Sequence, residues 1–424
     1  MKICYKTIAI AVLIFFQCAP VIALADLDAK QAILSSWQNF PTVIKATQDL
    51  ATSQSMTSAA KWQRFPTLNA SAGKTSNSLN TSSDTPVTLS ISQPIYTGGK
   101  ITSGIESAYA GEKGAEFGIS EAKWGLADNI LKLLSTYTVS LNRVEESKLN
   151  VRENERLVKL VRARVEGEVS PELDLRIAQS RLDSARSQLL DYEQQVQQAK
   201  QALNVYTATV SEYQAVEPSR LISMETGDLD TLNAEAENRS PTLLHKNTEV
   251  QSAEADVGSA KSAIMPSVIA RLDRSLNSTN GIPSSTQVGV YIQFQPDAGL
   301  ASLSKIQSYE SKVDSAKSQY DVAKQQLFLD IQQTLNDLVF AQKRLPYLEN
   351  TAVIAKKGVS SFLRQYEAGR RGWLELLNQQ REAYDAKMSY LQVREKILAL
   401  SWHLAVITGR FENELQLDGY EASK

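Results

Sequence analysis

The chain repeats one plan twice, with a nearly constant shift between the copies. Identical residues recur 200 positions apart, in the pairs Pro41 and Pro241, Ala60 and Ala260, Lys61 and Lys261, Pro66 and Pro266, and Gly99 and Gly299. The apolar repeats of the two helical segments described next follow at a shift of 201. One nearly constant shift over about 170 residues indicates a tandem duplication. The fold is therefore expected to contain two copies of one structural unit.

Each copy contains a glycine-bearing turn followed by a seven-residue apolar repeat. The second turn contains Gly369 and Gly372, and the repeat after it comprises Leu376, Ala383, Tyr390, Ile397 and Leu404, flanked by Ala386, Val393, Leu400 and Ile407. The first copy has the same repeat at Leu175, Leu182, Leu189, Val196 and Leu203, flanked by Ala178, Ala185, Tyr192, Ala199 and Tyr206. Apolar residues in this heptad pattern form coiled-coil seams. The sequence thus predicts two helical hairpins.

Long helical stretches precede both turns, from about Ile101 to Val165 and from about Leu300 to Tyr366. At ~1.5 Å per residue, roughly 65 helical residues would reach about 100 Å. Pro346 lies inside the second stretch, where a proline should kink or break the helix. Shorter helices are expected near the start of each copy, from Pro41 to Arg64 and from Pro241 to Ala263.

Two alternating segments lie between the helices of each copy and predict a β-hairpin. Their apolar residues are Leu68, Ala70, Ala72, Val87, Leu89 and Ile91 in the first copy and Val268, Ala270, Leu272, Val288, Val290, Ile292 and Phe294 in the second. In the second strand of each hairpin the opposite face is neutral, with Thr88, Ser90 and Ser92 in the first copy and Gly289, Tyr291 and Gln293 in the second. Such a face fits a membrane barrel with a wet lumen better than a soluble sheet. Four strands leave open edges that lipid does not tolerate, so we expect three copies to close one barrel.

The segment 1–25 is predicted to be a secretory signal peptide. Lys2 and Lys6 precede an apolar run, and Ala23-Leu24-Ala25 favours cleavage before Asp26. The sequence before Cys18 is a poor match to a lipidation signal, so an acylated N-terminus is not expected. Both cysteines lie within this segment, which leaves the mature chain without disulfides.

Composition excludes several classes of function. The mature chain would carry 43 basic residues, because two of the 45 leave with the signal peptide, against 47 acidic residues. It therefore lacks the basic footprint of a nucleic-acid-binding protein. His245 and His403 do not have metal-ligand spacing, and neither a phosphate-binding loop nor a nucleophile elbow is present. We expect no enzymatic activity, no metal and no cofactor.

The order of these features resembles the TolC family of outer-membrane factors. The resemblance rests on the duplicated plan, on Ser-Gln-Pro-Ile-Tyr-Thr-Gly-Gly at 92–99, and on Tyr-Glu-Ala-Gly at 366–369, while Ala298 replaces one glycine in the second copy. It implies an α+β membrane protein: a homotrimer whose strands form a 12-stranded barrel in the outer membrane of a Gram-negative bacterium, with a long α-helical coiled-coil tunnel in the periplasm.

The resemblance also implies a passive exit duct that works with a periplasmic adaptor and an inner-membrane ABC or proton-driven transporter. Type I protein secretion is the leading hypothesis, because many efflux ducts are acylated and this chain lacks a lipidation signal. Small-molecule efflux of drugs or metals is the alternative. A periplasmic coiled-coil adaptor is a remoter one, but an adaptor does not need four amphipathic strands.

Several residues of the two hairpins match functional positions of the family. Tyr366 and Arg371 stand where the family keeps residues that lock the periplasmic gate, and Asp174 matches the acidic partner of the tyrosine. Glu375 and Asn378 stand at the pore constriction, where one ring of charge is kept and the other lost. Ordinary seam packing or solvent exposure is the alternative for these residues.

The two turns would form the adaptor-contacting tips, through Gly167 and Glu168 in the first turn and Gly369 and Arg370 in the second. Asp174 follows Gly167 by seven positions, whereas Glu375 follows Gly369 by six. We therefore expect the first turn to be one residue longer and the gate contacts to be rearranged.

These features divide the chain into five segments. We expect a signal peptide at 1–25, a first repeat at 26–210, an equatorial connector at 211–238, a second repeat at 239–410 and a C-terminal tail at 411–424.

Overall fold

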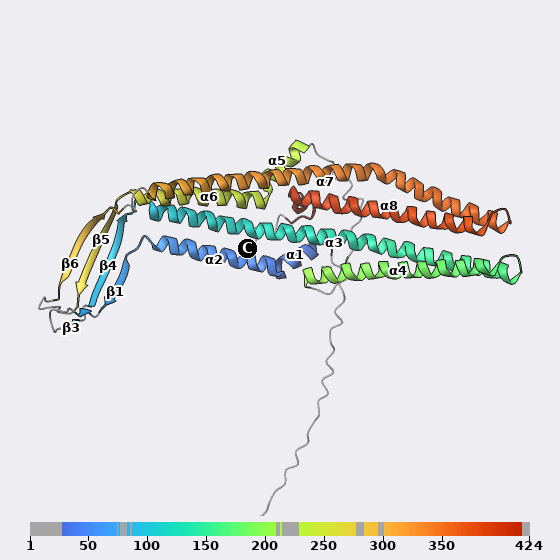
Figure 1. Cartoon of the computed structure of the whole chain (residues 1–424), viewed down its shortest axis with the longest axis horizontal. Helices are drawn as coiled ribbons and strands as arrows, with labels where there is room; N and C mark the ends of the chain where they lie inside the picture. The colour runs from blue at the N-terminus through green and yellow to red at the C-terminus, as the bar shows by residue number, and fades with distance from the viewer. Residues whose placement is uncertain are drawn as a thin grey trace, which may run out of the picture.

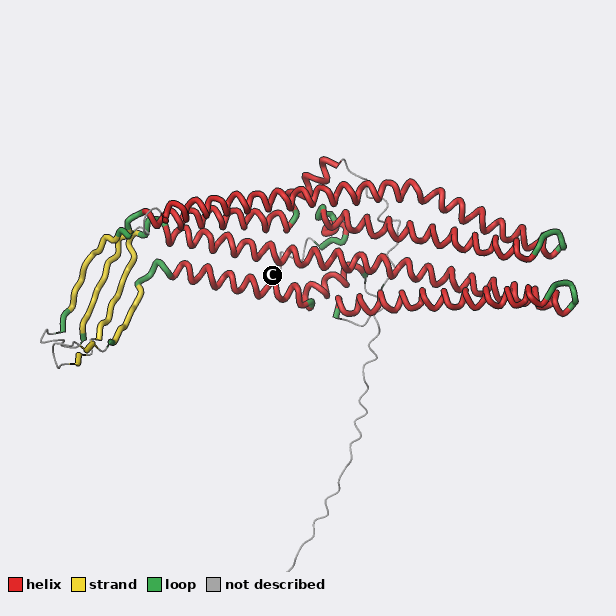
Figure 2. The backbone as a smooth tube through the Cα atoms, viewed as in Figure 1, coloured by secondary structure: helices red, strands yellow, loops and turns green. Residues whose placement is uncertain are grey.

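The computed structural model describes residues 28–73, 75–76, 83–84, 87–208, 213, 229–276, 284–295 and 301–417. The predicted signal peptide, most of the predicted connector and Ala298 lie outside the described residues. The molecule is elongated, with a β-sheet at one end and two helical turns at the other (Figure 1). Nearly everything between these ends is helix (Figure 2).

The elements confirm the internal repeat. The first copy contains α1 (Ala29–Asn39), α2 (Pro41–Trp62), β1 (Thr67–Ala72), β4 (Val87–Tyr96), α3 (Lys100–Glu166) and α4 (Glu172–Thr207). The second contains α5 (Leu229–Arg239), α6 (Pro241–Lys261), β5 (Ser267–Ser275), β6 (Thr286–Gln293), α7 (Ala301–Glu367) and α8 (Trp373–Ile407). Short pieces complete the described fold: β2 (Thr75–Ser76), β3 (Ser83–Asp84), η2 (Ser262–Ile264) and α9 (Phe411–Glu414).

Two short helices that the periodic patterns do not predict, α1 and α5, open the two copies. The bounds of α1 and α5 are related by the same shift as the two copies, so the second copy begins with α5 rather than at residue 239. The side chain of Asp28 caps α1 by accepting a hydrogen bond from the Ala29 backbone. Ile33 and Trp37 then bury one face of α1 against the core. The sequence contains the signal for this helix, which is an aspartate directly before a segment whose apolar residues lie on one face.

The two predicted hairpins join into one four-stranded antiparallel sheet with the order β1-β4-β5-β6. The register aligns apolar residues across all four strands on one face in the row of Leu68, Ile91, Leu272 and Val288. In the row of Ala70 and Leu89, β5 and β6 contribute Arg274 and Thr286 instead. The other face carries rows of polar residues such as Asn69, Ser90, Asp273 and Gln287. The predicted two-faced sheet is confirmed.

The long helices α3 and α7 each contain 67 residues and pass continuously from the sheet to the turns. Of the kink or break expected at Pro346, the break does not occur, and α7 bends beyond its middle (Figure 1). A proline removes only one backbone hydrogen bond, and Leu345 and Leu348 beside it pack against a buried cluster that holds the helix in place. No helix in the described ranges is both long enough and apolar enough to cross a membrane.

Helix α8 buries two adjacent apolar stripes rather than the single predicted seam. Leu376, Ile397 and Leu404 of the predicted seam are buried. A second stripe, one position further along, is also buried, at Leu377, Tyr384, Leu391, Leu398 and Ala405. Two stripes are needed because α8 packs against both α7 and α3. Helix α8 therefore joins the two hairpins.

His403 of α8 lies between carboxylates from both long helices. Its Nδ1 is 2.9 Å from Asp128 of α3 and its Nε2 is 3.2 Å from Asp330 of α7. Hydrogen bonds to Asp128 and then to Asp330 raise the pKa of His403 to about 9. Burial raises the pKa of Asp128, but its hydrogen bonds with His403 and Lys132 lower that pKa by more. The charged imidazole thus ties three helices together.

We predict that His403→Gln removes a pH-dependent part of the stability. The raised pKa means that the charged histidine stabilises the fold fully below about pH 6.5 and that this contribution is lost as the pH rises through about 9. It amounts to about 1–2 kcal/mol after screening at this partly exposed site. Thermal unfolding between pH 6 and pH 9.5 should show a falling melting temperature in the wild type and a flatter profile in the variant. Equal slopes would contradict the assignment, and Asp330→Asn should flatten the profile in part.

Candidate functional site: the helical hairpin ends

The two turns have the same backbone geometry, and one residue in each has a left-handed conformation. This residue is Glu168 in the first turn (φ 58°) and Gly369 in the second (φ 72°). The Val169 amide donates to the Arg164 carbonyl, and at the matching place in the second turn the Arg370 amide donates to the Gln365 carbonyl. These bonds close each helix in the manner of a Schellman motif. Glu168 therefore occupies the place of Gly369.

The prediction that the first turn is one residue longer than the second is wrong. Both turns join a helix that ends at one residue to a helix that begins six positions later, from Glu166 to Glu172 and from Glu367 to Trp373. The prediction aligned Gly167 with Gly369, but Gly167 has a φ of −84° and does not use the freedom of glycine. With the correct alignment, Asp174 is the counterpart of Glu375.

Tyr366 is buried where the two hairpins meet. Its side chain is 3% exposed, and its ring lies 5.7 Å from the ring of Trp373. The guanidinium of Arg164, from the last turn of α3, lies 4.6 Å from the centre of the Tyr366 ring. Arg164 Nη1 also donates a 3.0 Å hydrogen bond to the Tyr366 carbonyl. The Tyr366 hydroxyl has no hydrogen-bond partner in the described part of the chain.

The predicted lock between Tyr366 or Arg371 and Asp174 is not formed within the chain. Arg371 instead bonds within its own hairpin, where Nε donates to Gln365 at 3.0 Å and Nη1 to Glu375 at 3.3 Å. The structure joins the hairpin ends through Arg164 and Tyr366, so the sequence identified the tyrosine but not its partner. The sequence did contain a signal for Arg164, because it is a basic residue in the last turn of a predicted helix beside an apolar seam.

Glu375 and Asn378 lie one turn apart on α8, and both are exposed. Their side chains are therefore free to face a central axis, as the prediction requires. The Glu375 carboxylate pairs with Arg371, and both side chains remain substantially exposed, at 53% and 38%. The pair is screened by water, and Arg371 offsets part of the negative charge that Glu375 would present to a pore.

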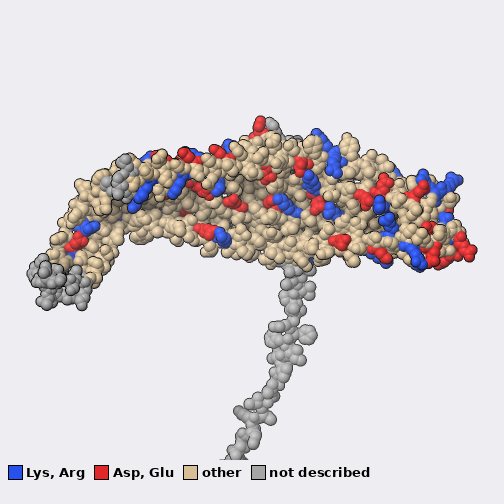
Figure 3. All heavy atoms as spheres, in the orientation of Figure 1, with Lys and Arg blue, Asp and Glu red and all other residues tan. Residues whose placement is uncertain are grey.

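The two tips differ in charge. The first turn has four carboxylates and no basic residue between Glu166 and Asp174, whereas the second has Arg370 and Arg371 beside two carboxylates. Figure 3 shows this contrast as a red corner and a blue corner at the helical end of the molecule. The residues predicted to contact an adaptor are all exposed there, namely Gly167, Glu168, Gly369 and Arg370.

Between the tips and His403, α3 and α8 are joined mainly by polar contacts. Arg143 pairs with Glu395 at 2.7 Å, and Lys387 pairs with Glu146 at 3.7 Å. The hydroxyl of Tyr384 lies 2.8 Å from that of Ser147, and burial raises the pKa of this tyrosine to about 12. The interface between the hairpins is thus apolar at both ends and polar in its middle.

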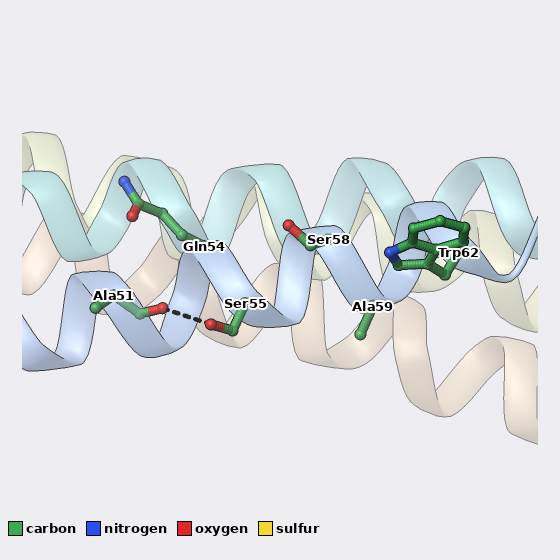
Figure 4. A pocket seen from close by; sticks show the side chains of 6 residues that line it. All are labelled: Ala51, Gln54, Ser55, Ser58, Ala59 and Trp62. Carbon is green, nitrogen blue, oxygen red and sulfur yellow. Dashed lines mark hydrogen bonds between the residues drawn. The ribbon is translucent and has the colours of Figure 1, made fainter.

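The described residues offer little for catalysis or cofactor binding. They contain no group of three His, Asp or Glu side chains arranged to hold a metal ion. A hollow on the outer face of α2 is lined by Ala51, Gln54, Ser55, Ser58, Ala59 and Trp62, and Ser55 bonds there to the Ala51 carbonyl (Figure 4). These side chains come from one helix face and include no acid, base or strong nucleophile.

Comparison with known proteins decides the family. The model of the outer membrane efflux protein family matches residues 33–209 and 232–410, one match for each copy of the repeat. The chain belongs to this family. It is accordingly an outer-membrane protein with a helical periplasmic part, and it serves as a transport duct rather than as an enzyme. Curated protein sequences give no match.

Solved structures share the fold at low sequence identity. A membrane protein from Pseudomonas aeruginosa has 17% identity and a TM-score of 0.79, covering 91% of this chain and 93% of its own. The outer membrane protein VceC from Vibrio cholerae has 17% identity and a TM-score of 0.76, covering 90% and 96%. The open-state MtrE outer membrane channel from Neisseria gonorrhoeae has 15% identity and a TM-score of 0.77, covering 90% and 88%.

We predict that Arg164 holds the hairpin ends together and that the Tyr366 hydroxyl does not. Arg164→Met removes the cation–π contact and the bond to the Tyr366 carbonyl, each worth about 1–2 kcal/mol. Amide hydrogen exchange at residues 364–373 should therefore accelerate about tenfold. Tyr366→Phe retains the ring and should leave exchange within about twofold. Faster exchange in Tyr366→Phe but not in Arg164→Met would show that the Tyr366 hydroxyl, rather than Arg164, holds the hairpin ends together.

Proposed function

We propose that this chain forms a homotrimeric exit duct in the outer membrane, as one part of a tripartite export system. The observation that carries the proposal is the sheet, which has one apolar face, one polar face and open edges at β1 and β6. Lipid does not tolerate open edges, and three copies would supply twelve strands for one closed barrel. Helices α3 and α7 would continue the barrel into a periplasmic tunnel.

A periplasmic adaptor and an inner-membrane ABC or proton-driven transporter are the partners that we propose. The tips lie at the end of the molecule farthest from the sheet, where a duct anchored in the outer membrane would meet such partners (Figure 1). The acidic first tip would favour basic residues of an adaptor, and the basic second tip would favour acidic ones. Gly167, Glu168, Gly369 and Arg370 are the proposed contact residues.

Type I protein secretion remains our proposed cargo class, with small-molecule efflux as the alternative. The poor lipidation signal before Cys18 supports the first. The description of the matching family, outer membrane efflux protein, supports the second. The neighbouring genes distinguish them, because an ABC exporter beside a giant adhesin would indicate protein secretion and a proton-driven pump would indicate efflux.

The resting duct should be closed at the tips, because a permanent opening would breach the outer-membrane barrier. We propose that opening swings the second hairpin, from Lys356 to Leu400, against the first. The partly exposed contacts in the middle of the α3–α8 interface, such as that of Lys387 with Glu146, support this motion, because they can exchange with water whereas an apolar seam cannot. Tyr366, Arg371 and Asp174 remain our proposed gate residues, and Arg164 joins them.

We predict that, in a planar bilayer, the duct in its open state conducts ions with a preference for cations at the tip. Three Glu375 carboxylates around one axis would attract cations, and the paired Arg371 would weaken this attraction. Reversal potentials in a salt gradient should show that Glu375→Gln lowers the cation-to-anion permeability ratio by about threefold. Arg371→Gln should raise that ratio.

Glu172→Gln is the matched control, because it removes one carboxylate from the other tip. Its permeability ratio should equal that of the wild type. An unchanged ratio in Glu375→Gln would remove Glu375 from the pore.

A further inference from the structure

Arg274 is the one charged residue on the apolar face of the described four-stranded sheet. The strand register pairs it with Leu89 of β4 and with Thr286 of β6, so it shares their face and not the opposite, polar face. Every other residue of the paired strands on that face is uncharged. Arg274 is exposed. A charged side chain is therefore placed on the surface that would meet lipid.

Arg274 lies near the end of the sheet farthest from the helices, because β5 starts beside α6 and ends at Ser275 (Figure 1). At the helical end, the exposed rings of Tyr96 and Phe294 mark the level where hydrocarbon gives way to headgroups. From Val268, which pairs with Tyr96, the strand advances about 20 Å to Arg274, or about 15 Å along the membrane normal at the usual strand tilt. The apolar band of such barrels is about 25 Å tall. The long side chain of Arg274 can thus extend from the outer half of this band to the headgroups of the outer leaflet.

The described sheet offers no carboxylate to neutralise Arg274. Asp273 precedes it in β5, but Asp273 pairs with Ser90 and Gln287 on the polar face. Neighbouring copies would bring the same outward-facing strand residues, so they would add no carboxylate from these strands. The guanidinium has no ion-pair partner among the described residues. In the sequence, the shift of 200 positions relates Arg274 to Lys74, so both copies of the repeat keep a basic residue at this position.

We propose that Arg274 binds a phosphate group of the glycolipid in the leaflet that faces the cell exterior. An unpaired guanidinium beside hydrocarbon is costly, and a guanidinium binds phosphate through two parallel hydrogen bonds. The hydroxyl of Thr286, which is paired with Arg274, can donate a further hydrogen bond to the same group. The outer leaflet of a Gram-negative outer membrane consists mainly of phosphorylated glycolipid. The proposal rests on the membrane insertion described under the proposed function.

The test measures which lipid the purified assembly retains. Full-length protein is extracted from membranes in mild detergent and incubated with equal amounts of phosphorylated lipid A and of the same lipid without its phosphates. Bound lipid is then extracted and quantified by mass spectrometry. The wild type should retain the phosphorylated form in about fivefold preference, the ratio expected for one basic residue at an anionic surface. Arg274→Gln should reduce this to less than about twofold, and Arg274→Lys should retain most of it.

Arg271→Gln is the matched control. It removes the same charge from the same strand, but Arg271 lies on the polar face, in register with Ser92 and Gly289. Its guanidinium lies 5.6 Å from the centre of the Tyr291 ring. The lipid preference of Arg271→Gln should equal that of the wild type, because this side chain would face the lumen.

Equal retention of both lipids by the wild type would overturn the proposal, and so would equal loss of preference in Arg274→Gln and Arg271→Gln. Loss of the preference in millimolar inorganic phosphate, compared with chloride at the same ionic strength, would indicate a site for free anions instead. An assembled barrel without lipid preference rejects only the contact at Arg274. Release of the protein from cells without detergent would reject the membrane duct itself.

Discussion

The outer edges of β1 and β6 impose the main constraint on this molecule. Each edge strand has only one neighbour in the described sheet, so its other side presents backbone donors and acceptors without a partner strand. Water can satisfy such groups, but hydrocarbon cannot. The apolar face of the sheet requires lipid, and lipid requires closed edges. Because one chain has only four strands in this sheet, assembly with other copies follows from these two requirements.

The helices meet a different requirement. They must hold two hairpins side by side and still allow the hairpin ends to separate. Helix α8 achieves the first through two buried stripes, one on α7 and one on α3. His403, charged between Asp128 and Asp330, fixes the hairpins near their base. Beyond it, polar pairs join α3 to α8, and at the hairpin ends a buried apolar cluster and the contact of Arg164 with Tyr366 hold the hairpins together again. A swing of the second hairpin must therefore open this terminal cluster.

The sequence predicted the architecture well, because the architecture depends on periodic patterns. Heptads, period-two strands and the constant shift between the copies each extend over many residues, so one misleading position changes little. The same reasoning failed where one residue decides. Glu168 adopts the left-handed conformation that glycine favours, so aligning Gly167 with Gly369 shifted the first turn by one position. Polar partners across hairpins, such as Arg164 for Tyr366, depend on three-dimensional packing that no spacing along the chain encodes.

Covalent cross-linking of the sheet edges tests the central claim most directly. In protein lacking Cys4 and Cys18, one cysteine replaces Ala70 in β1 and a second replaces Val288, Val290 or Ile292 in β6. Within one chain, β4 and β5 separate these edges by about 14 Å, which is too far for a disulfide. If neighbouring copies close the barrel, at least one of these cysteine pairs should give disulfide-linked dimers and trimers. Each variant with only one of the two cysteines should remain a monomer. Monomers from every pair in membrane-extracted protein would contradict the account.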